Sequence, residues 1–327
     1  LSTKLKAESF IHSGASNMAP KLLTALIAAG FVLCWSSGFV GGRLATESTT
    51  PIMLLFAWRL LFATLVVGVW WRLTHRDAIP WLPMRQEFWV GILTMGGYLL
   101  GVILALEFGV STGVTALIAS LQPLLAAGLA GPWLGERQST RGWVGMAIAT
   151  VGVLMCVLGD FNGAGNAPLW AYGLPLMSVV SLTVGSILGV RLTTVLPMAA
   201  TLTAQLSAAT LVFVVAALVV VVFGWRAGHD LTLVPSFDPV TVVAIAWLIL
   251  LSSFGGYGFF VASLRRTGVT ATTTLVYLTP PVTLVWAALM FGEEPTLLAV
   301  AGMLVASGGV ALAMTKLPAV QAQVWPA

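Results

Sequence analysis

The sequence predicts an all-α, polytopic membrane protein with ten transmembrane helices, arranged as two inverted five-helix repeats. Apolar residues make up 58% of its 327 residues and charged residues only 8%, whereas a soluble domain carries about 25% charged residues. Ten apolar stretches reach about the 20 residues that a helix needs to cross a bilayer. A pattern of matched residues also occurs twice along the chain, which indicates a tandem duplication.

The composition excludes several classes of protein. A chain this apolar cannot cover itself with a polar surface, so we expect the lipid bilayer to surround it. The net charge of +4 does not indicate nucleic-acid binding, because Lys and Arg are scattered between apolar runs. Cys34 and Cys156 lie inside apolar runs and form no metal or redox motif, so we interpret them as packing residues. No cofactor and no metal site is expected.

The predicted membrane helices are separated by segments that contain charged residues, Pro or Gly. In chain order we expect helices at residues 20–42, 51–71, 88–107, 111–133, 141–159, 168–190, 198–223, 240–263, 268–291 and 296–315. Between them lie, in the same order, Glu47 to Pro51, Arg72 to Arg85, residues 108–111, Glu136 to Arg141, Asp160 to Pro168, Arg191 to Pro197, Gly224 to Pro239, residues 264–267 and Glu293 to Pro295. The two shortest connections imply antiparallel neighbours.

The chain divides into four parts. Residues 20–160 form the first five-helix repeat and residues 161–315 form the second. Residues 1–19 are polar and mixed in character, so we expect an N-terminal arm or an addition foreign to the native chain, and no cleavable signal peptide. Residues 316–327 are expected to form a cytoplasmic tail.

The distribution of Lys and Arg predicts the orientation in the membrane. If the N-terminus is cytoplasmic, twelve basic residues lie on the cytoplasmic side, and only Arg43 and Arg226 lie outside. This bias agrees with the positive-inside rule, so we expect both termini in the cytoplasm.

The duplicated pattern opens with the string Thr-Gly-Val-Thr-Ala, at residues 112–116 and again at 267–271. It continues with four matched pairs offset by 157 residues: Pro123 and Pro280, Gly135-Glu136 and Gly292-Glu293, Gly145-Met146 and Gly302-Met303, and Gly152-Val153 and Gly309-Val310. Because five helices are an odd number, the second repeat enters the membrane from the opposite side. The repeats are therefore predicted to be inverted, with a shared binding site between them near the bilayer midplane.

Further matches support the duplication. Gly96-Gly97-Tyr98 recurs as Gly255-Gly256-Tyr257, and Gly41-Gly42-Arg43-Leu44 recurs loosely as Gly189-Val190-Arg191-Leu192. The segment Pro51…Arg59-Leu60…Ala63-Thr64-Leu65 recurs as Pro197…Gln205-Leu206…Ala209-Thr210-Leu211.

These features resemble the EamA-type members of the drug/metabolite transporter superfamily over roughly residues 20–315. The resemblance rests on the paired halves, on the string Trp35-Ser36-Ser37-Gly38-Phe39, and on a mid-helix proline followed by Gly-Glu and a Gly-rich helix in each half. Within the superfamily the chain is most similar to bacterial exporters of amino acids, including aromatic ones. The resemblance implies a multi-pass protein of the bacterial inner membrane that exports substrate from the cytoplasm by alternating access.

Prolines and paired glycines inside the helices are the candidate hinges. Pro123 and Pro280 each remove a backbone N–H near a helix centre, which a membrane tolerates only beside a partner or a polar cavity. Each is either a static kink or a moving hinge. The pairs Gly96, Gly97 and Gly255, Gly256 permit either close helix packing or a flexible gate.

Arg59 is the one basic residue well inside a predicted helix. A charge at this depth is costly, so Arg59 is expected to face a cavity or a partner. Three interpretations stay open: a static ion pair with Glu107, binding of a substrate carboxylate, or snorkelling to the outer surface. Its repeat counterpart Gln205 is neutral, so the fold itself does not require the charge.

We expect a central cavity formed mainly by the first, third, fourth, sixth, eighth and ninth predicted helices. Apolar walls with few charges suit a zwitterion that carries an apolar side chain. The candidate substrate-binding residues are Trp35, Ser36, Ser37, Phe39, Arg59, Tyr98, Thr115, Gln122, Ser181, Tyr257, Tyr277 and Thr279.

The predicted function is export of amino acids and related small metabolites, without enzymatic activity. Its partners are then a small-molecule substrate and the lipid bilayer, and a monomer suffices because each half supplies the partner of the other. Buried carboxylates and histidines for proton coupling are not evident at mid-membrane depth, which favours a facilitator or a substrate exchanger. The alternatives are a carrier for other metabolites or drugs, a nucleotide-sugar-type carrier, an intramembrane enzyme, or an assembly protein that does not transport.

Overall fold

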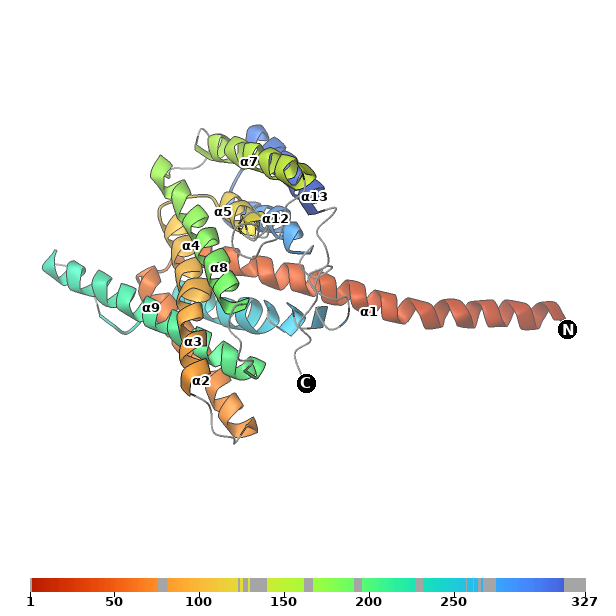
Figure 1. Ribbon diagram of the computed structural model, residues 1–327, viewed down its shortest axis with the longest axis horizontal. Coiled ribbons are helices and arrows are strands. Elements are labelled where there is room, and N and C mark those ends of the chain that lie inside the picture. The colour runs from red at the N-terminus through yellow and green to blue at the C-terminus, as the bar shows by residue number, and fades with distance from the viewer. Residues whose placement is uncertain are drawn as a thin grey trace.

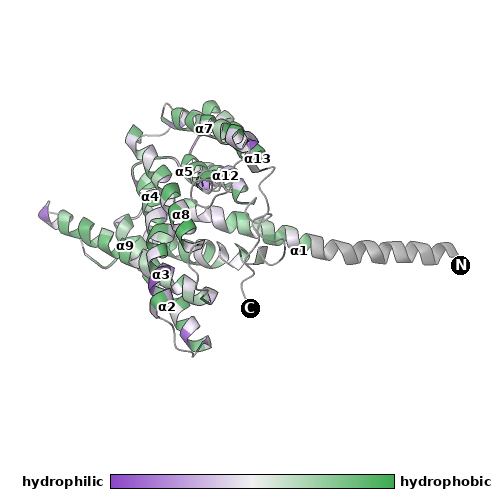
Figure 2. Ribbon diagram, viewed as in Figure 1, coloured by the Kyte–Doolittle hydropathy of each residue, from purple (hydrophilic) through white to green (hydrophobic). Residues whose placement is uncertain are grey.

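The computed structural model describes residues 2–75, 81–122, 140–161, 167–190, 196–227, 232–256 and 275–314, together with residues 124–125, 129, 258–260, 262–263 and 266. Every regular element within these ranges is helical, which confirms the all-α class for the described residues. Seven of the described helices are long and apolar enough to cross a membrane. Apolar residues run along the helices, with hydrophilic residues mainly near their ends (Figure 2). The protein is therefore a polytopic membrane protein.

The helices form a bundle through which α1 passes (Figure 1). In chain order they are α1 (Ser2–Ala45), α2 (Ile52–Thr74), α3 (Trp81–Gly91), the π-helix η1 (Ile92–Gly97), α4 (Tyr98–Glu107), α5 (Thr112–Ala119), α7 (Thr140–Phe161), the 3-10 helix η2 (Leu169–Tyr172), α8 (Gly173–Val190), α9 (Met198–Arg226), α10 (Pro239–Trp247), the π-helix η3 (Leu248–Gly255), the 3-10 helix η4 (Val276–Leu278), α12 (Thr279–Phe291) and α13 (Leu297–Met314).

Seven predicted spans correspond to helices of membrane length. The other three contain α5 and the apolar helices Val276–Phe291 and Leu297–Leu312, which are described over shorter lengths. The count of ten therefore stays a prediction. Two boundaries differ from the sequence analysis. Helix α1 continues back to Ser2, where the sequence predicts an arm, and the third span begins at Trp81, which places Glu87 inside a helix.

Proline and aspartate residues fix where several helices begin. Helices α2 and α9 start directly after Pro51 and Pro197, whose fixed φ suits the entry to a helix. Helix α10 starts after Asp238, whose carboxylate accepts hydrogen bonds from the backbone N–H groups of Val240 and Thr241, each at 3.0 Å. This satisfies donors that have no partner within the helix.

Asp238 makes stability depend on pH. Hydrogen bonds from Ser236, Thr241 and Thr49 hold the pKa of the Asp238 carboxyl well below its usual range. A carboxyl with a lowered folded-state pKa stabilises the fold fully above the unfolded-state pKa of about 3.9. That contribution is lost as the pH falls from this value toward the lower folded-state pKa.

We expect Asp238→Ala to lower the thermal unfolding temperature of the detergent-solubilised protein at neutral pH. Asp238→Asn keeps a good cap residue but removes the titrating group, so its unfolding temperature should lose the acid dependence below about pH 4. Thermal unfolding from neutral pH to about pH 3 checks both results. Equal losses for the two variants at neutral pH would contradict the capping role.

Helices α7 and α13 pack through glycines (Figure 1). A Cβ added to Gly152 would lie 2.6 Å from the carbonyl oxygen of Gly302, and one added to Gly309 would lie 2.7 Å from that of Gly145. Backbone therefore touches backbone, which a residue with a side chain would prevent. The repeat pattern pairs Gly145 with Gly302 and Gly152 with Gly309, so the contacts cross between the two pairs.

Helices α2 and α9 form a second close pair. The side-chain oxygens of Thr64 and Thr210 lie 2.9 Å apart, and the ring of Phe56 stacks on Phe213 with 5.4 Å between centroids. Both phenylalanines are fully buried. Thr64 and Thr210 are the matched positions of the two repeats, so the pair brings equivalent residues into contact.

Two π-helices interrupt the membrane helices at the matched glycine pairs. Helix η1 ends at Gly97 and η3 ends at Gly255. A Cβ on Gly97 would lie 2.3 Å from the Ser181 hydroxyl oxygen of α8, and one on Gly255 would lie 2.9 Å from the Cys34 sulfur of α1. Close packing thus accounts for both glycines. The π-helices that end at these glycines are a geometry that proteins often place at functional sites.

Candidate functional site

Four of the candidate residues, Trp35, Ser36, Ser37 and Phe39, lie together near the C-terminal end of α1. Ser36 and Ser37 are fully buried, and Phe39 is buried beside them. The Ser36 hydroxyl donates to the Thr279 carbonyl oxygen at 3.4 Å, which joins α1 to the start of α12. The Trp247 indole N–H donates to the Ser37 carbonyl oxygen at 3.0 Å, which joins α1 to α10.

Several buried hydroxyls near this point have no hydrogen-bond partner among the described residues. They belong to Thr115 on α5, to Tyr277 in η4, and to Thr279 and Thr283 on α12. Helix α12 packs against both α1 and α5. A buried hydroxyl without a partner costs about 1–3 kcal/mol, so this cluster is suited to accept hydrogen bonds from a polar ligand. Two further such hydroxyls belong to Thr183 on α8 and Thr201 on α9.

Arg59 is buried on α2, with 6% of its surface exposed. One terminal nitrogen lies 3.2 Å from the Ser253 hydroxyl and 3.4 Å from the Ser252 hydroxyl, both in η3. The guanidinium carbon lies 5.0 Å from the centre of the Phe56 ring. A Cβ on Gly38 would lie 2.9 Å from the Ser252 hydroxyl oxygen, so Ser252 stands between Arg59 and the α1 string.

The remaining candidates are spread around this centre. The Trp35 ring packs in a cluster with Phe31 and Phe260, at 5.5 Å and 5.8 Å between centroids. Tyr98 is partly buried against the core around α2, and Gln122 follows α5 in a partly buried position. The Ser181 hydroxyl donates to the Leu93 carbonyl oxygen at 2.9 Å, so it serves the π-helix η1.

The hinge candidates differ in what surrounds them. Gly96 and Gly97 sit in η1, and Gly255 and Gly256 sit at the end of η3. Pro280 is buried in the first turn of α12, where the backbone N–H that proline lacks would have no partner within the helix in any case. It therefore begins a helix after the 3-10 turn η4, where the sequence analysis had placed it near a helix centre. Tyr257 and Pro123 lie outside the described residues.

A cavity of about 380 Å³ lies at the end of the bundle that contains Arg43. Its lining is rich in carboxylates, which come from Glu107, Asp160, Glu293 and Glu294. Glu107, one proposed counter-charge for Arg59, thus lines the same cavity as Arg43.

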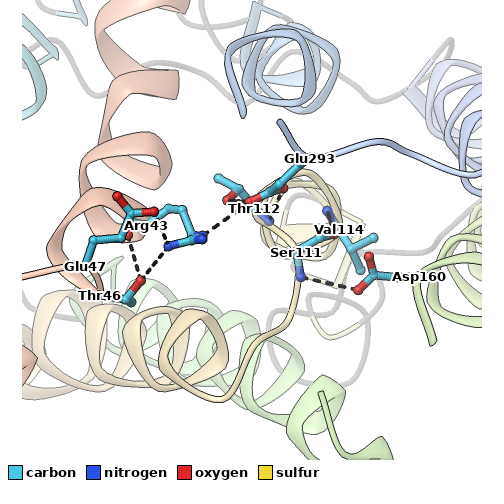
Figure 3. Close-up of polar contacts among 8 residues, drawn as sticks. All are labelled: Arg43, Thr46, Glu47, Ser111, Thr112, Val114, Asp160 and Glu293. Carbon is cyan, nitrogen blue, oxygen red and sulfur yellow. Dashed lines mark hydrogen bonds and ion pairs between the residues drawn. The ribbon is translucent and has the colours of Figure 1, made fainter. Parts of the chain in front are cut away.

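Two of these carboxylates hold the start of α5 (Figure 3). Glu293 accepts hydrogen bonds from the Thr112 backbone N–H at 3.1 Å and the Thr112 hydroxyl at 2.7 Å. Asp160 accepts from the Ser111 backbone N–H at 3.3 Å and from the Tyr172 hydroxyl at 2.8 Å. Negative charge is favourable at a helix N-terminus, which carries the positive end of the helix dipole.

Arg43 completes this group from the end of α1 (Figure 3). Its guanidinium lies 3.0 Å from Glu47 in the turn after α1 and 3.5 Å from Glu293. It also lies over the ring of Phe291, 5.0 Å from its centre. We call Arg43, Thr112 and Glu293 the Glu293 cluster.

The model of the EamA-like transporter family matches this chain twice, at residues 22–158 and 159–315. The chain belongs to the EamA-like transporter family. The transporter is also 26% identical over 261 residues to the uncharacterized inner membrane transporter YedA of Escherichia coli K12, covering 80% of each chain. It is 24% identical over 279 residues to a probable amino-acid metabolite efflux pump of Salmonella typhimurium LT2, covering 85% of this chain and 90% of that protein.

The fold agrees with a known structure. A chain of known crystal structure aligns with a TM-score of 0.58 and 18% identity, covering 89% of this transporter and 98% of that chain. This likeness concerns the fold alone.

Three carboxylates that form hydrogen bonds between distant segments of the structure were not among the candidate residues of the sequence analysis. Glu293 belongs to the repeated Gly-Glu pair, so its recurrence was an available signal. Asp160 and Glu87 carry no repeated pattern and lie at the edges of predicted helices. Glu87 is buried and accepts a hydrogen bond from the Gln205 amide at 2.9 Å, which brings the repeat counterpart of Arg59 against α3.

Proposed function

We propose that this transporter exports amino acids, including aromatic ones, from the cytoplasm across the bacterial inner membrane by alternating access. Membership of the EamA-like transporter family supports transport. The names of the relatives, an inner membrane transporter and a probable amino-acid metabolite efflux pump, support the membrane and the substrate class. No enzymatic role is proposed.

The observation that carries this proposal is the set of buried hydroxyls on α5, η4 and α12 that have no partner among the described residues. Together with Ser36 on α1 and the nearby Arg59, it offers hydrogen bonds and one positive charge inside apolar walls. An amino acid presents a carboxylate, an ammonium group and a side chain of variable polarity. Arg59 suits the carboxylate, and the aromatic cluster of Phe31, Trp35 and Phe260 suits an aromatic side chain.

We further propose the full architecture of ten helices in two inverted repeats, residues 20–160 and 161–315. The crossed contacts of Gly145 with Gly309 and of Gly152 with Gly302 support it, because a two-fold axis between repeats exchanges such pairs. The contact between the matched residues Thr64 and Thr210 is what a residue near that axis would make. Cytoplasmic termini follow from the distribution of Lys and Arg, and one chain then forms a complete carrier.

In this architecture the two π-helices are proposed as the bending points. They lie at matched positions, one against α8 and one against α1. Pro123 remains a proposed kink of the fourth helix. Pro280 marks the change from the 3-10 helix η4 to α12 in the ninth.

The direct test is uptake of labelled tryptophan, phenylalanine and threonine into liposomes that contain the purified protein, with and without an imposed pH gradient. We expect saturable uptake that prefers the aromatic amino acids and needs no gradient. If folded protein transports none of the three, the amino-acid assignment is wrong. A screen of drugs, nucleotide sugars and other metabolites would then follow.

Thr279→Val and Thr115→Val separate a binding role of the hydroxyls from a structural one. Each removes a hydroxyl that has no described partner and keeps the shape of the side chain. We expect the unfolding temperature to stay equal or rise, because an unsatisfied buried group is removed. Loss of one hydrogen bond to substrate, worth about 1 kcal/mol, should raise KM about five-fold.

Thr150→Val on α7 is the matched control. Thr150 is exposed, and its hydroxyl donates to the Met146 carbonyl oxygen in its own helix. It should change neither KM nor the unfolding temperature beyond a small shift. A lower unfolding temperature with unchanged KM for the Thr115 and Thr279 variants would show that their hydroxyls serve the fold.

A further inference from the structure

The Glu293 cluster joins three parts of the chain that are far apart in sequence. Arg43 lies at the end of α1, Thr112 is the first residue of α5, and Glu293 lies between α12 and α13. Both oxygens of the Glu293 carboxylate are engaged by Thr112, and one of them also faces the Arg43 guanidinium at 3.5 Å. One side chain therefore ties three elements together at the border of the 380 Å³ cavity.

The contacts of Glu293 are suited to break and re-form. Its side chain is 21% exposed and that of Arg43 is 29% exposed, so water can replace the lost partners. Partly exposed ion pairs add little net stability. Arg43 also keeps Glu47 at 3.0 Å, in the turn directly after α1, so its charge is not left alone when Glu293 moves.

The backbone beside Glu293 permits such a movement. The preceding Gly292 has a φ of 65°, and a Cβ there would meet nothing within 4 Å. Residues 292–296 are not part of any helix. Asp160 differs from Glu293 on each point. It is buried, it lies in the last turn of α7, and it accepts hydrogen bonds from Tyr172 and Ser111. Asp160 is therefore a fixed anchor of α5, and Glu293 is a releasable one.

The sequence repeats the three residue types of the cluster. Arg43, Thr112 and Glu293 have their counterparts in Arg191, Thr267 and Glu136, which lie outside the described residues. A duplicated carrier keeps a set of residues in both halves when both halves use it. This recurrence sets the cluster apart from an incidental surface ion pair.

We propose that Glu293 is a positioning residue for transport, and that the Glu293 cluster is a latch that keeps one end of the carrier closed. Release of Glu293 from Thr112 and Arg43 frees α1, α5 and the α12–α13 connection to separate and opens the cavity. The role of the latch in export rests on the proposed function. The orientation proposed above places it at the outer side, so its opening belongs to substrate release.

The native Cys156 reports this opening. Cys156 lines the cavity, yet the residue is only 1% exposed. The chain contains one other cysteine, Cys34, so a Cys34→Ser parent has a single reactive thiol. The rate at which a hydrophilic maleimide labels Cys156 in nanodiscs then measures how often the latch is open, without any substrate.

Glu293→Gln removes the charge of the latch and nearly keeps its shape. We expect labelling of Cys156 to be about ten-fold faster, the change for losing about one charge-assisted hydrogen bond from the closed form. Arg43→Gln removes the other charge of the ion pair and should also make labelling of Cys156 faster. Glu47→Gln is the matched control, because Glu47 also pairs with Arg43 but joins α1 only to the turn that follows it. Its labelling rate should equal that of the parent.

Thermal unfolding separates opening from misfolding. The labelling rate of a variant is interpreted only if its unfolding temperature stays near that of the parent. If Glu293→Gln is unstable, the labelling rate of Arg43→Gln provides the test. Unchanged labelling in the folded variants, or an equal increase for Glu47→Gln, would overturn the latch. Faster labelling in a carrier that transports none of the three amino acids would keep the latch and overturn only the proposed substrate.

Discussion

Gly309→Leu is expected to prevent α13 from packing on α7 and to abolish stable folding. A Cβ at this position would lie 2.4 Å from the Ala149 backbone nitrogen and 2.7 Å from the Gly145 carbonyl oxygen. These are backbone atoms of a packed helix and cannot move aside as a flexible side chain can. Overpacking commonly costs about 1–3 kcal/mol, and a leucine forced against backbone should exceed that range. The measurement is the yield of monodisperse protein and its unfolding temperature in detergent.

Gly308→Leu is the control, one residue earlier on the same helix. Gly308 is exposed, and a Cβ there would meet nothing within 4 Å. It should face lipid, where leucine is favourable, and replacing a helix-interior glycine adds about 1 kcal/mol of helix propensity. We expect an unchanged or higher unfolding temperature. Similar behaviour of the two variants would contradict the close α7–α13 contact.

Arg59→Gln is expected to reduce transport strongly while leaving the fold intact. Gln is the residue at the matched repeat position, Gln205, so it is compatible with this place in a helix of the fold. A charged hydrogen bond to a substrate carboxylate is worth about 1.5–3 kcal/mol, so its loss should raise KM by about 10–100-fold. Uptake kinetics of the best substrate, measured beside the unfolding temperature, check this result.

Arg59→Lys and a change of substrate sharpen the test. Lysine keeps the charge but lacks the planar guanidinium that can contact two hydroxyls and a carboxylate together. It should therefore recover part of the affinity lost in Arg59→Gln. An amine that lacks the carboxylate should be transported equally by parent and variant, if at all. A fall in unfolding temperature with an unchanged KM would mean that Arg59 only stabilises the contact between α2 and η3.

The sequence alone determined the class of the fold and predicted the relation between its halves. An apolar content of 58% leaves a chain of this length no alternative to lipid, and long apolar runs can then satisfy their backbone groups only as helices. It also marked the residues where helices approach one another, because contacts such as those of Gly152 and Gly97 accept only glycine. The hydroxyls of Thr115, Tyr277 and Thr279 were selected from depth alone, and the structure leaves them buried without described partners.

Only the tertiary structure decided which residues meet. The carboxylate of Glu293 was visible as part of a repeated pair, but its partners Thr112 and Arg43 lie 181 and 250 residues away along the chain. The sequence predicts Asp160 as the first residue of a connection between helices, whereas the structure buries it. Burial depends on neighbours that are distant in sequence, so a local pattern cannot predict it. Periodicity and composition are local properties and determine helices, whereas a hydrogen bond between distant helices depends on their register and rotation. The Glu293 cluster is therefore a product of packing.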